Sequence, residues 1–233
     1  MEIFTMFVDT ASLVVVFMPL LVISVSLWFS CQAKWNVLFR DLGVPLGLFW
    51  SVLGATGMTV NLSDAKAVGP ATSIMLLTIT YGGLVSALGY FASFKGSKPS
   101  SQNNQQTAGW KVITFIFVII QPLTLWGMHS AAGLAAFINP VALSVLGTTV
   151  IAAILLSDSD HRIEVLCQAS LLSAMISLVF GLVLLYTSFS GEGINEGMYE
   201  GLKIAMNGLL YGLLSYICLY IVSYKFGTTE KID

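Results

Sequence analysis

The sequence predicts an all-α integral membrane protein of about seven transmembrane helices. Apolar residues make up 56% of its 233 positions and charged residues only 9%, whereas a soluble domain carries about 25% charged residues. Seven stretches are apolar over the length of about 20 residues that a helix needs to cross a bilayer. We therefore expect the chain to lie in a lipid bilayer. No basic stripe with interleaved aromatic residues is present, so we do not expect it to bind nucleic acid.

The seven predicted helices follow one another through mostly short connections. Because a charge at the bilayer centre costs about 2.5–3.5 kcal/mol, all twelve acidic residues are expected in connections or at helix ends. Only one longer connection, residues 96–109, is polar and rich in Gly, Ser and Gln, and we interpret it as a linker. The predicted helices are residues 10–30, 42–61, 71–94, 110–128, 138–156, 164–188 and 201–225.

The distribution of Lys and Arg predicts the orientation in the membrane. With the N-terminus outside, eight of the ten basic residues fall on the side of the linker, and only Lys66 and Lys203 fall on the other side. Basic residues favour the cytoplasmic side of a membrane. We therefore expect the N-terminus outside the cell, and the linker and the C-terminus in the cytoplasm.

The third and seventh predicted helices resemble each other. A shift of 130 residues aligns them without gaps and gives seven identical positions out of 25, Tyr81/Tyr211 and Gly82/Gly212 among them. Two three-helix units can have the same orientation only if one more helix lies between them, and the fourth helix supplies it. The sequence thus predicts two parallel units, residues 1–95 and 110–233, the second including the extra helix.

Small residues recur along single faces of these helices. Lipid provides no hydrophobic drive for helix association, so close helix contacts depend on such residues. The simpler interpretation is tight packing within the chain, and the alternative is a face that lines a pore or holds a partner helix. The candidates are Gly54, Gly82, Ser86, Gly89, Gly208, Gly212 and Ser215.

Residues 49–82, FWSVLGATGMTVNLSDAKAVGPATSIMLLTITYG, resemble the MotA/TolQ/ExbB ion-channel subunits, and the flagellar stator subunits in particular. Those proteins carry a Gly-Thr pair on one helix, then an outer loop N-x-D-D-P-K-A-I-G-P, then the run L-L-T-T-L-Y-G. Residues 133–149 resemble the family's F-I-D-P-P-S stretch. The outer-loop motif is retained here at Asn61, Asp64, Gly69 and Pro70, and Pro70 is expected to begin the following helix.

The resemblance implies a function. Subunits of that family form a ring around a small single-span partner of the MotB/TolR/ExbD type, whose aspartate carries a proton or sodium ion. It therefore implies a homo-oligomer in the bacterial inner membrane, with transported H⁺ or Na⁺ and no other cofactor or metal. The ion-path candidates are Ser51, Thr78 and Thr80, because hydroxyls can replace part of a hydration shell. The alternative is that these hydroxyls bond to carbonyls of their own helices.

The chain also departs from the family pattern. The connections that would carry the family's large cytoplasmic insertion are short here, so direct torque on a rotor is not expected. Gly208 and Leu178 stand where Thr78 and Ser51 do, so the second unit is expected to lack the hydroxyls. No carboxylate lies inside the predicted spans, so an ion relay would have to use one from a partner.

Two other kinds of function remain open. A structural or assembly protein could keep the scaffold and hold a partner helix without conducting ions, and a solute transporter is compatible with parallel repeats. Enzyme activity and catalytic residues are not expected. His129 and His161 are predicted on opposite sides of the membrane, and no nucleophile–base set is present.

Overall fold

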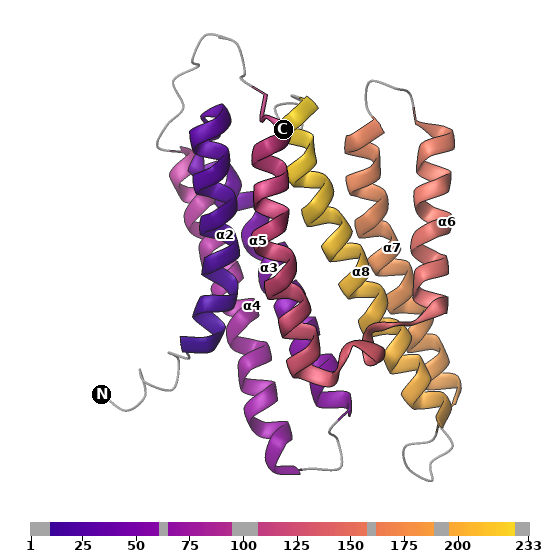
Figure 1. The fold of residues 1–233 in the computed structure, drawn as a ribbon. Helices are drawn as coiled ribbons and strands as arrows, with labels where there is room; N and C mark the ends of the chain where they lie inside the picture. The colour runs from indigo at the N-terminus through magenta and orange to yellow at the C-terminus, as the bar shows by residue number, and fades with distance from the viewer. Residues whose placement is uncertain (1–9, 61–64, 95–106, 158–161, 189–195, 227–233) are drawn as a thin grey trace.

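The computed structural model describes residues 10–60, 65–94, 107–157, 162–188 and 196–226. The regular structure of these residues is entirely helical, so the predicted all-α fold is confirmed (Figure 1). Its elements are α2 (Thr10–Cys31), α3 (Trp35–Val60), α4 (Ala65–Phe94), α5 (Trp110–Ala132), the 3₁₀ turn η1 (Leu134–Phe137), α6 (Pro140–Leu156), α7 (Arg162–Thr187) and α8 (Glu196–Phe226).

Six of the seven described α-helices are long and apolar enough to cross a membrane. The exception is α6, whose 17 residues reach about 25 Å at 1.5 Å per residue, slightly less than the hydrocarbon core. Successive helices run antiparallel, and α2 begins at the opposite end of the bundle from the end of α8 (Figure 1). The chain is therefore a multi-pass membrane protein.

Helices α3 and α8 lie at the centre of the bundle. α3 packs along α4 and also contacts α2, α5 and α8, while α8 packs along α7 and contacts α6. Figure 1 accordingly shows α6 and α7 on one side of α8 and α2 to α5 on the other. Leu20, Leu42, Ile116 and Leu210 are completely buried in this centre.

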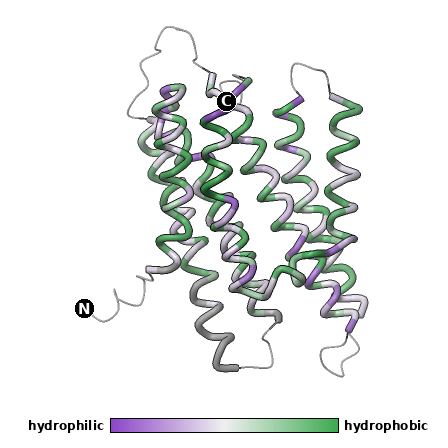
Figure 2. The backbone as a smooth tube through the Cα atoms, in the orientation of Figure 1, coloured by the Kyte–Doolittle hydropathy of each residue, from purple (hydrophilic) through white to green (hydrophobic). Residues whose placement is uncertain are grey.

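The outer faces of the bundle carry many large apolar side chains. Figure 2 shows hydrophobic residues along each of the helices that it colours. Large apolar side chains on these faces are exposed, for example Phe91 at 68%, Leu155 at 78% and Leu156 at 88%. Such a continuous apolar exterior would be unstable in water and is the surface that lipid chains cover.

Helix α3 begins at Trp35 rather than at residue 42 as predicted. Arg40 and Asp41 therefore lie within a helix that can span a membrane, and the prediction that every acidic residue lies in a connection or at a helix end is wrong for Asp41. The two charges form a pair, with 2.7 Å between Arg40 Nε and Asp41 Oδ1. Pairing lowers the cost of placing both within the helix, which the apolar pattern alone could not indicate.

Helix α4 also begins earlier than predicted, at Ala65 rather than at residue 71. Pro70, expected at the helix start, therefore lies in the second turn. The connection between α5 and α6 comprises residues 133–139, whereas residues 129–137 were predicted. Gly133 takes a left-handed φ of 76°, which a glycine adopts without strain, and the Asn139 side chain caps α6 by accepting from the Ala142 N–H at 3.0 Å.

Candidate functional site

The interface between α3 and α4 brings two backbones into contact. A Cβ atom on Gly82 would lie 2.5 Å from the Gly43 carbonyl oxygen and 2.7 Å from the Gly47 Cα. No side chain fits between the two helices at this level. The small-residue face of α4 is therefore directed into the chain's own core, towards α3.

The same interface continues towards the N-terminal end of α3. Ser86 Oγ donates to the Arg40 carbonyl at 2.5 Å, and a Cβ on Gly89 would clash with the backbone of Arg40. In the other direction the helices separate, because a Cβ on Gly54 would meet only the Met75 Cβ, at 4.0 Å. The contact is thus closest at the Gly82 and Gly89 end.

The hydroxyls of Ser51 and Thr78 both donate to one backbone carbonyl. Ser51 Oγ lies 2.9 Å from the Met75 oxygen and Thr78 Oγ1 lies 3.0 Å from it. Both side chains are buried, with 5% and 1% exposure. Thr80, by contrast, is exposed and donates to the Leu76 carbonyl at 2.7 Å. Ser51 of α3 and Thr78 of α4 therefore meet inside the α3–α4 interface, whereas Thr80 lies on an exposed face of α4.

The outer-loop motif is described only in part. Asn61 and Asp64 lie outside the described residues, and Gly69 and Pro70 lie in the first two turns of α4. Ser215 is half-buried on α8.

Helices α7 and α8 form a second small-residue interface. A Cβ on Gly212 would lie 2.5 Å from both the Ala174 Cβ and the Ser170 carbonyl oxygen. One turn earlier, Gly208 faces the Ser177 side chain so closely that a Cβ there would clash with it. Gly208 and Leu178 carry no hydroxyl, as expected, but Ser177, the neighbour of Leu178, places a hydroxyl beside Gly208.

The two small-residue interfaces have the same register. A shift of 130 residues relates α4 to α8 and places Gly82 on Gly212. A shift of 127 residues relates α3 to α7 and places Gly47 on Ala174. Gly82 contacts Gly47, and Gly212 contacts Ala174. The carbonyl that faces each glycine, from Gly43 or Ser170, is related by the same shift of 127.

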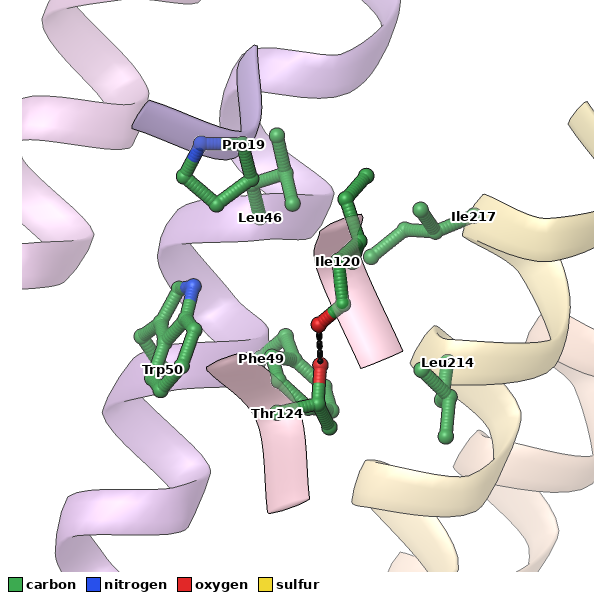
Figure 3. A pocket seen from close by; sticks show the side chains of 8 residues that line it. All are labelled: Pro19, Leu46, Phe49, Trp50, Ile120, Thr124, Leu214 and Ile217. Atoms are coloured by element: carbon green, nitrogen blue, oxygen red, sulfur yellow. Dashed lines mark hydrogen bonds between the residues drawn. The ribbon is translucent and has the colours of Figure 1, made fainter. Parts of the chain in front are cut away.

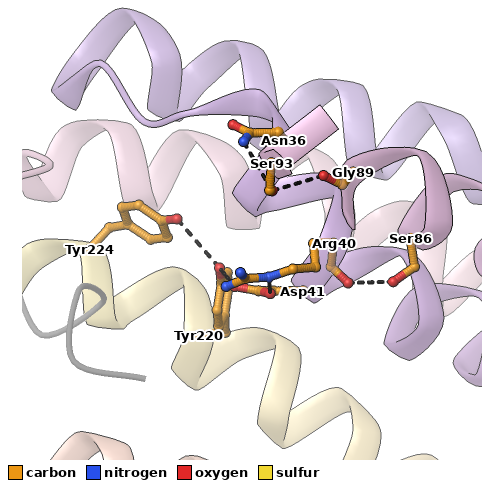
Figure 4. Close-up of polar contacts among 8 residues, drawn as sticks. All are labelled: Asn36, Arg40, Asp41, Ser86, Gly89, Ser93, Tyr220 and Tyr224. Atoms are coloured by element: carbon orange, nitrogen blue, oxygen red, sulfur yellow. Dashed lines mark hydrogen bonds and ion pairs between the residues drawn. The ribbon is translucent and has the colours of Figure 1, made fainter. Parts of the chain in front are cut away.

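A polar cluster joins α3 to α8 near the end of the bundle where α8 finishes (Figure 4). Tyr220 OH donates to Asp41 Oδ2 at 2.7 Å, and the hydroxyls of Tyr220 and Tyr224 are 3.4 Å apart. Arg40 holds the other carboxylate oxygen of Asp41. Sequence reasoning missed this cluster, because it placed Asp41 outside the helix.

The α5–α6 connection is anchored to α8 by two side chains. Asn207 Nδ2 donates to the Ala136 carbonyl at 3.1 Å. Tyr211 OH donates to the Phe137 carbonyl and accepts from the Asn139 N–H, the latter at 3.0 Å. Backbone groups of η1 and of the residue before α6 are thus satisfied by α8, as a membrane interior requires.

An apolar cavity lies between α2, α3, α5 and α8 (Figure 3). Its volume is about 250 Å³, including space open to the surroundings. Its single hydroxyl, on Thr124, donates to the Ile120 carbonyl at 3.0 Å. Its lining has no charged side chain, so the cavity offers an ion no charged ligand. The lining residues are Pro19, Leu46, Phe49, Trp50, Ile120, Thr124, Leu214 and Ile217.

Comparison with known proteins gives two partial similarities. The chain is 32% identical over 75 residues to the chemotaxis protein PomA of Vibrio alginolyticus, across 32% of this chain and 29% of the relative. It is 39% identical over 46 residues to the motility protein A of Cereibacter sphaeroides, across 20% of this chain and 18% of the relative.

The chain thus matches less than a third of the length of either relative. No family model and no solved structure matches the sequence. What the comparisons establish is a partial similarity to bacterial motility proteins of the MotA type, which agrees with the resemblance in residues 49–82.

Proposed function

We propose that this chain is a membrane subunit of an ion-driven complex of the stator type, acting with a single-span partner that carries an intramembrane aspartate. The similarity to PomA and to motility protein A carries this proposal. The motifs of residues 49–82 support it, because they fall on the hairpin of α3 and α4. The transported ion is H⁺ or Na⁺.

The face of α4 turned away from α3 is the proposed contact for the partner helix. Thr80 and Ala87 are exposed there, and a Cβ on Gly83, between them, would meet nothing within 4 Å. Small residues let another helix approach closely. The exposed Thr80 hydroxyl would then face the partner, whereas Ser51 and Thr78 are turned inwards.

Copurification tests this proposal. A tagged chain, extracted in mild detergent, should retain a small single-span protein with an aspartate near the start of its span. Gly83→Leu should abolish that retention. The matched control is Gly147→Leu on α6, because a Cβ on Gly147 also meets nothing within 4 Å. Absence of such a partner, or its undiminished retention by Gly83→Leu, contradicts the proposal.

A second candidate function is a non-conducting assembly protein with the same scaffold. It is favoured by the hydrogen bonds of Ser51 and Thr78, which both go to the Met75 carbonyl and leave neither hydroxyl without a partner. Under this candidate the partner is retained, yet Ser51→Ala combined with Thr78→Ala leaves the host phenotype intact. Loss of the phenotype with the partner still bound favours conduction.

Three structural features belong to the same proposal. We infer that the chain arose by duplication of a three-helix unit, for which the shared register of Gly82 and Gly212 is the support. We infer that several copies assemble in the bacterial inner membrane.

We also infer an outward N-terminus, which places the linker in the cytoplasm. Once the native cysteines are replaced, Ser100→Cys in the linker should therefore react with an impermeant thiol reagent only from the cytoplasmic side.

A further inference from the structure

The Trp50 indole carries a buried hydrogen-bond donor. Its Nε1 atom makes no hydrogen bond among the described residues, and Trp50 is only 5% exposed. An unpaired N–H is costly inside a membrane protein, because neither lipid nor bulk water can satisfy it there. An acceptor oxygen beside Nε1 would remove this cost.

Packing fixes the direction in which this donor points. The Trp50 ring lies against Gly127 of α5, where a Cβ atom would be 2.6 Å from Trp50 Cζ3. Phe49 packs on the indole edge to face, with 5.4 Å between the ring centroids. Figure 3 shows the nitrogen edge of the indole turned towards Pro19 of α2. The Trp50 N–H is therefore held in place and directed at α2.

The cavity beside Trp50 limits the size of a ligand. Trp50 and Pro19 both line this cavity, so it extends from the indole to α2. Its enclosed part has room for about one water molecule. Water is therefore a ligand of the right size, and its oxygen supplies the acceptor that the indole needs.

Pro19 leaves an acceptor of its own on α2. It lies in the interior of this helix and has no N–H, so the Val15 carbonyl one turn earlier lacks its usual donor. A helical carbonyl points towards the residue four positions later. The Val15 oxygen is therefore directed at Pro19, the residue that the Trp50 nitrogen also faces.

We infer that one water molecule is bound in this cavity and joins the Trp50 N–H of α3 to the Val15 carbonyl of α2. The water accepts from the indole and donates one proton to the carbonyl. Its second proton can bond the Thr124 oxygen, whose own proton goes to the Ile120 carbonyl. Three hydrogen bonds are typical of a buried water.

This water site goes beyond the proposed function. Ser51 takes the hydroxyl position of the Gly-Thr pair, so Trp50 stands where that pair has its glycine. The donor is thus a feature of this chain rather than of the motif. The site requires neither a partner protein nor a transported ion, so a failed copurification leaves it unaffected.

Nuclear magnetic resonance of the full chain in detergent micelles, with ¹⁵N-labelled tryptophan, tests the site. The Trp50 indole proton should show a rotating-frame Overhauser cross-peak to water, whose sign distinguishes it from exchange with bulk water. The absence of this cross-peak, or a cross-peak to detergent chains in its place, overturns the inference. Loss of the signal in Trp50→Phe assigns it. If that variant does not fold, the assignment comes from a chain in which Phe replaces the other four tryptophans, Trp28, Trp35, Trp110 and Trp126.

A pair of proline variants tests the acceptor. Pro19→Ala restores a backbone N–H that can bond the Val15 carbonyl, so the water should lose its place and the cross-peak should disappear. Pro45→Ala is the matched control, because Pro45 also lies inside a helix but does not line the cavity. It should leave the cross-peak unchanged. A cross-peak of full strength in Pro19→Ala overturns the bridge to α2, and the measurement on the parent chain decides the site if Pro19→Ala does not fold.

Discussion

The Tyr220 hydroxyl donates a hydrogen bond of 2.7 Å to Asp41, a residue 179 positions earlier in the chain. This bond joins α8 to α3, the two central helices. It also gives the Asp41 carboxylate a second donor beside Arg40. A charged pair inside an apolar helix is thus held by a hydroxyl from another part of the sequence.

Removing this hydroxyl should loosen the bundle. Tyr220→Phe is expected to lower the free energy of unfolding by about 0.6 kcal/mol, the average for a hydrogen bond between membrane helices. Chemical unfolding in mixed micelles measures the change. Tyr216→Phe is the control. The Tyr216 ring stacks on Tyr220 with 6.0 Å between ring centroids, and among the described residues its hydroxyl makes no hydrogen bond to Asp41. Equal losses in the two variants would contradict the role of the Asp41 contact.

The Arg40–Asp41 pair should show coupling in a double-mutant cycle. Asp41→Asn removes the negative charge that lies beside Arg40, and Arg40→Gln removes the positive charge that lies beside Asp41. The double variant should therefore lose less stability than the sum of the losses in the two single variants. Unfolding of all four proteins in the same detergent gives the coupling. Strict additivity would mean that the pair is screened by solvent.

Two adjacent glycines in α4 provide a matched test of the α3–α4 packing. Gly82→Ala places a methyl group against the Gly43 and Gly47 backbones and should cost about 1–3 kcal/mol of stability. Gly83→Ala faces open space and should stay within about 0.5 kcal/mol of the parent chain. Unfolding in detergent measures both changes, and a larger cost for Gly83→Ala would show that α4 packs through another face.

Gly212→Ala tests whether the second interface is equivalent to the first. The added methyl group would meet the Ala174 Cβ and the Ser170 carbonyl, so the loss should be of the same size as for Gly82→Ala. Combining it with Ala174→Gly removes one of the two clashes and should restore part of the stability. No restoration, with an unaltered fold, would speak against this register and weaken the proposal of duplication.

The sequence was sufficient to locate the helices approximately and to find the faces on which small residues recur. Apolar length alone located α2 and α7 closely, because lipid requires an apolar residue on nearly every outward position. It failed at the start of α3, where the Arg40–Asp41 pair and Tyr220 make a polar turn tolerable. Long-range pairing of this kind leaves no local pattern.

The polar candidates were less predictable than the helices. The small-residue face around Gly82 could be found from the spacing of these residues along the helix. That spacing does not indicate which other helix packs against the face. Alignment of the two halves of the chain matched Leu178 with Ser51 and so passed over Ser177, whose hydroxyl faces Gly208. The direction of a side chain depends on helix rotation, which only the packed structure supplies.

Ion flux through vesicles that contain both the chain and its copurified partner tests the proposed function most directly. We expect proton or sodium flux that requires both proteins and disappears when the partner's aspartate is replaced by asparagine. A closed, correctly assembled complex that passes neither ion, before or after that replacement, would contradict an ion-driven role and favour the assembly protein.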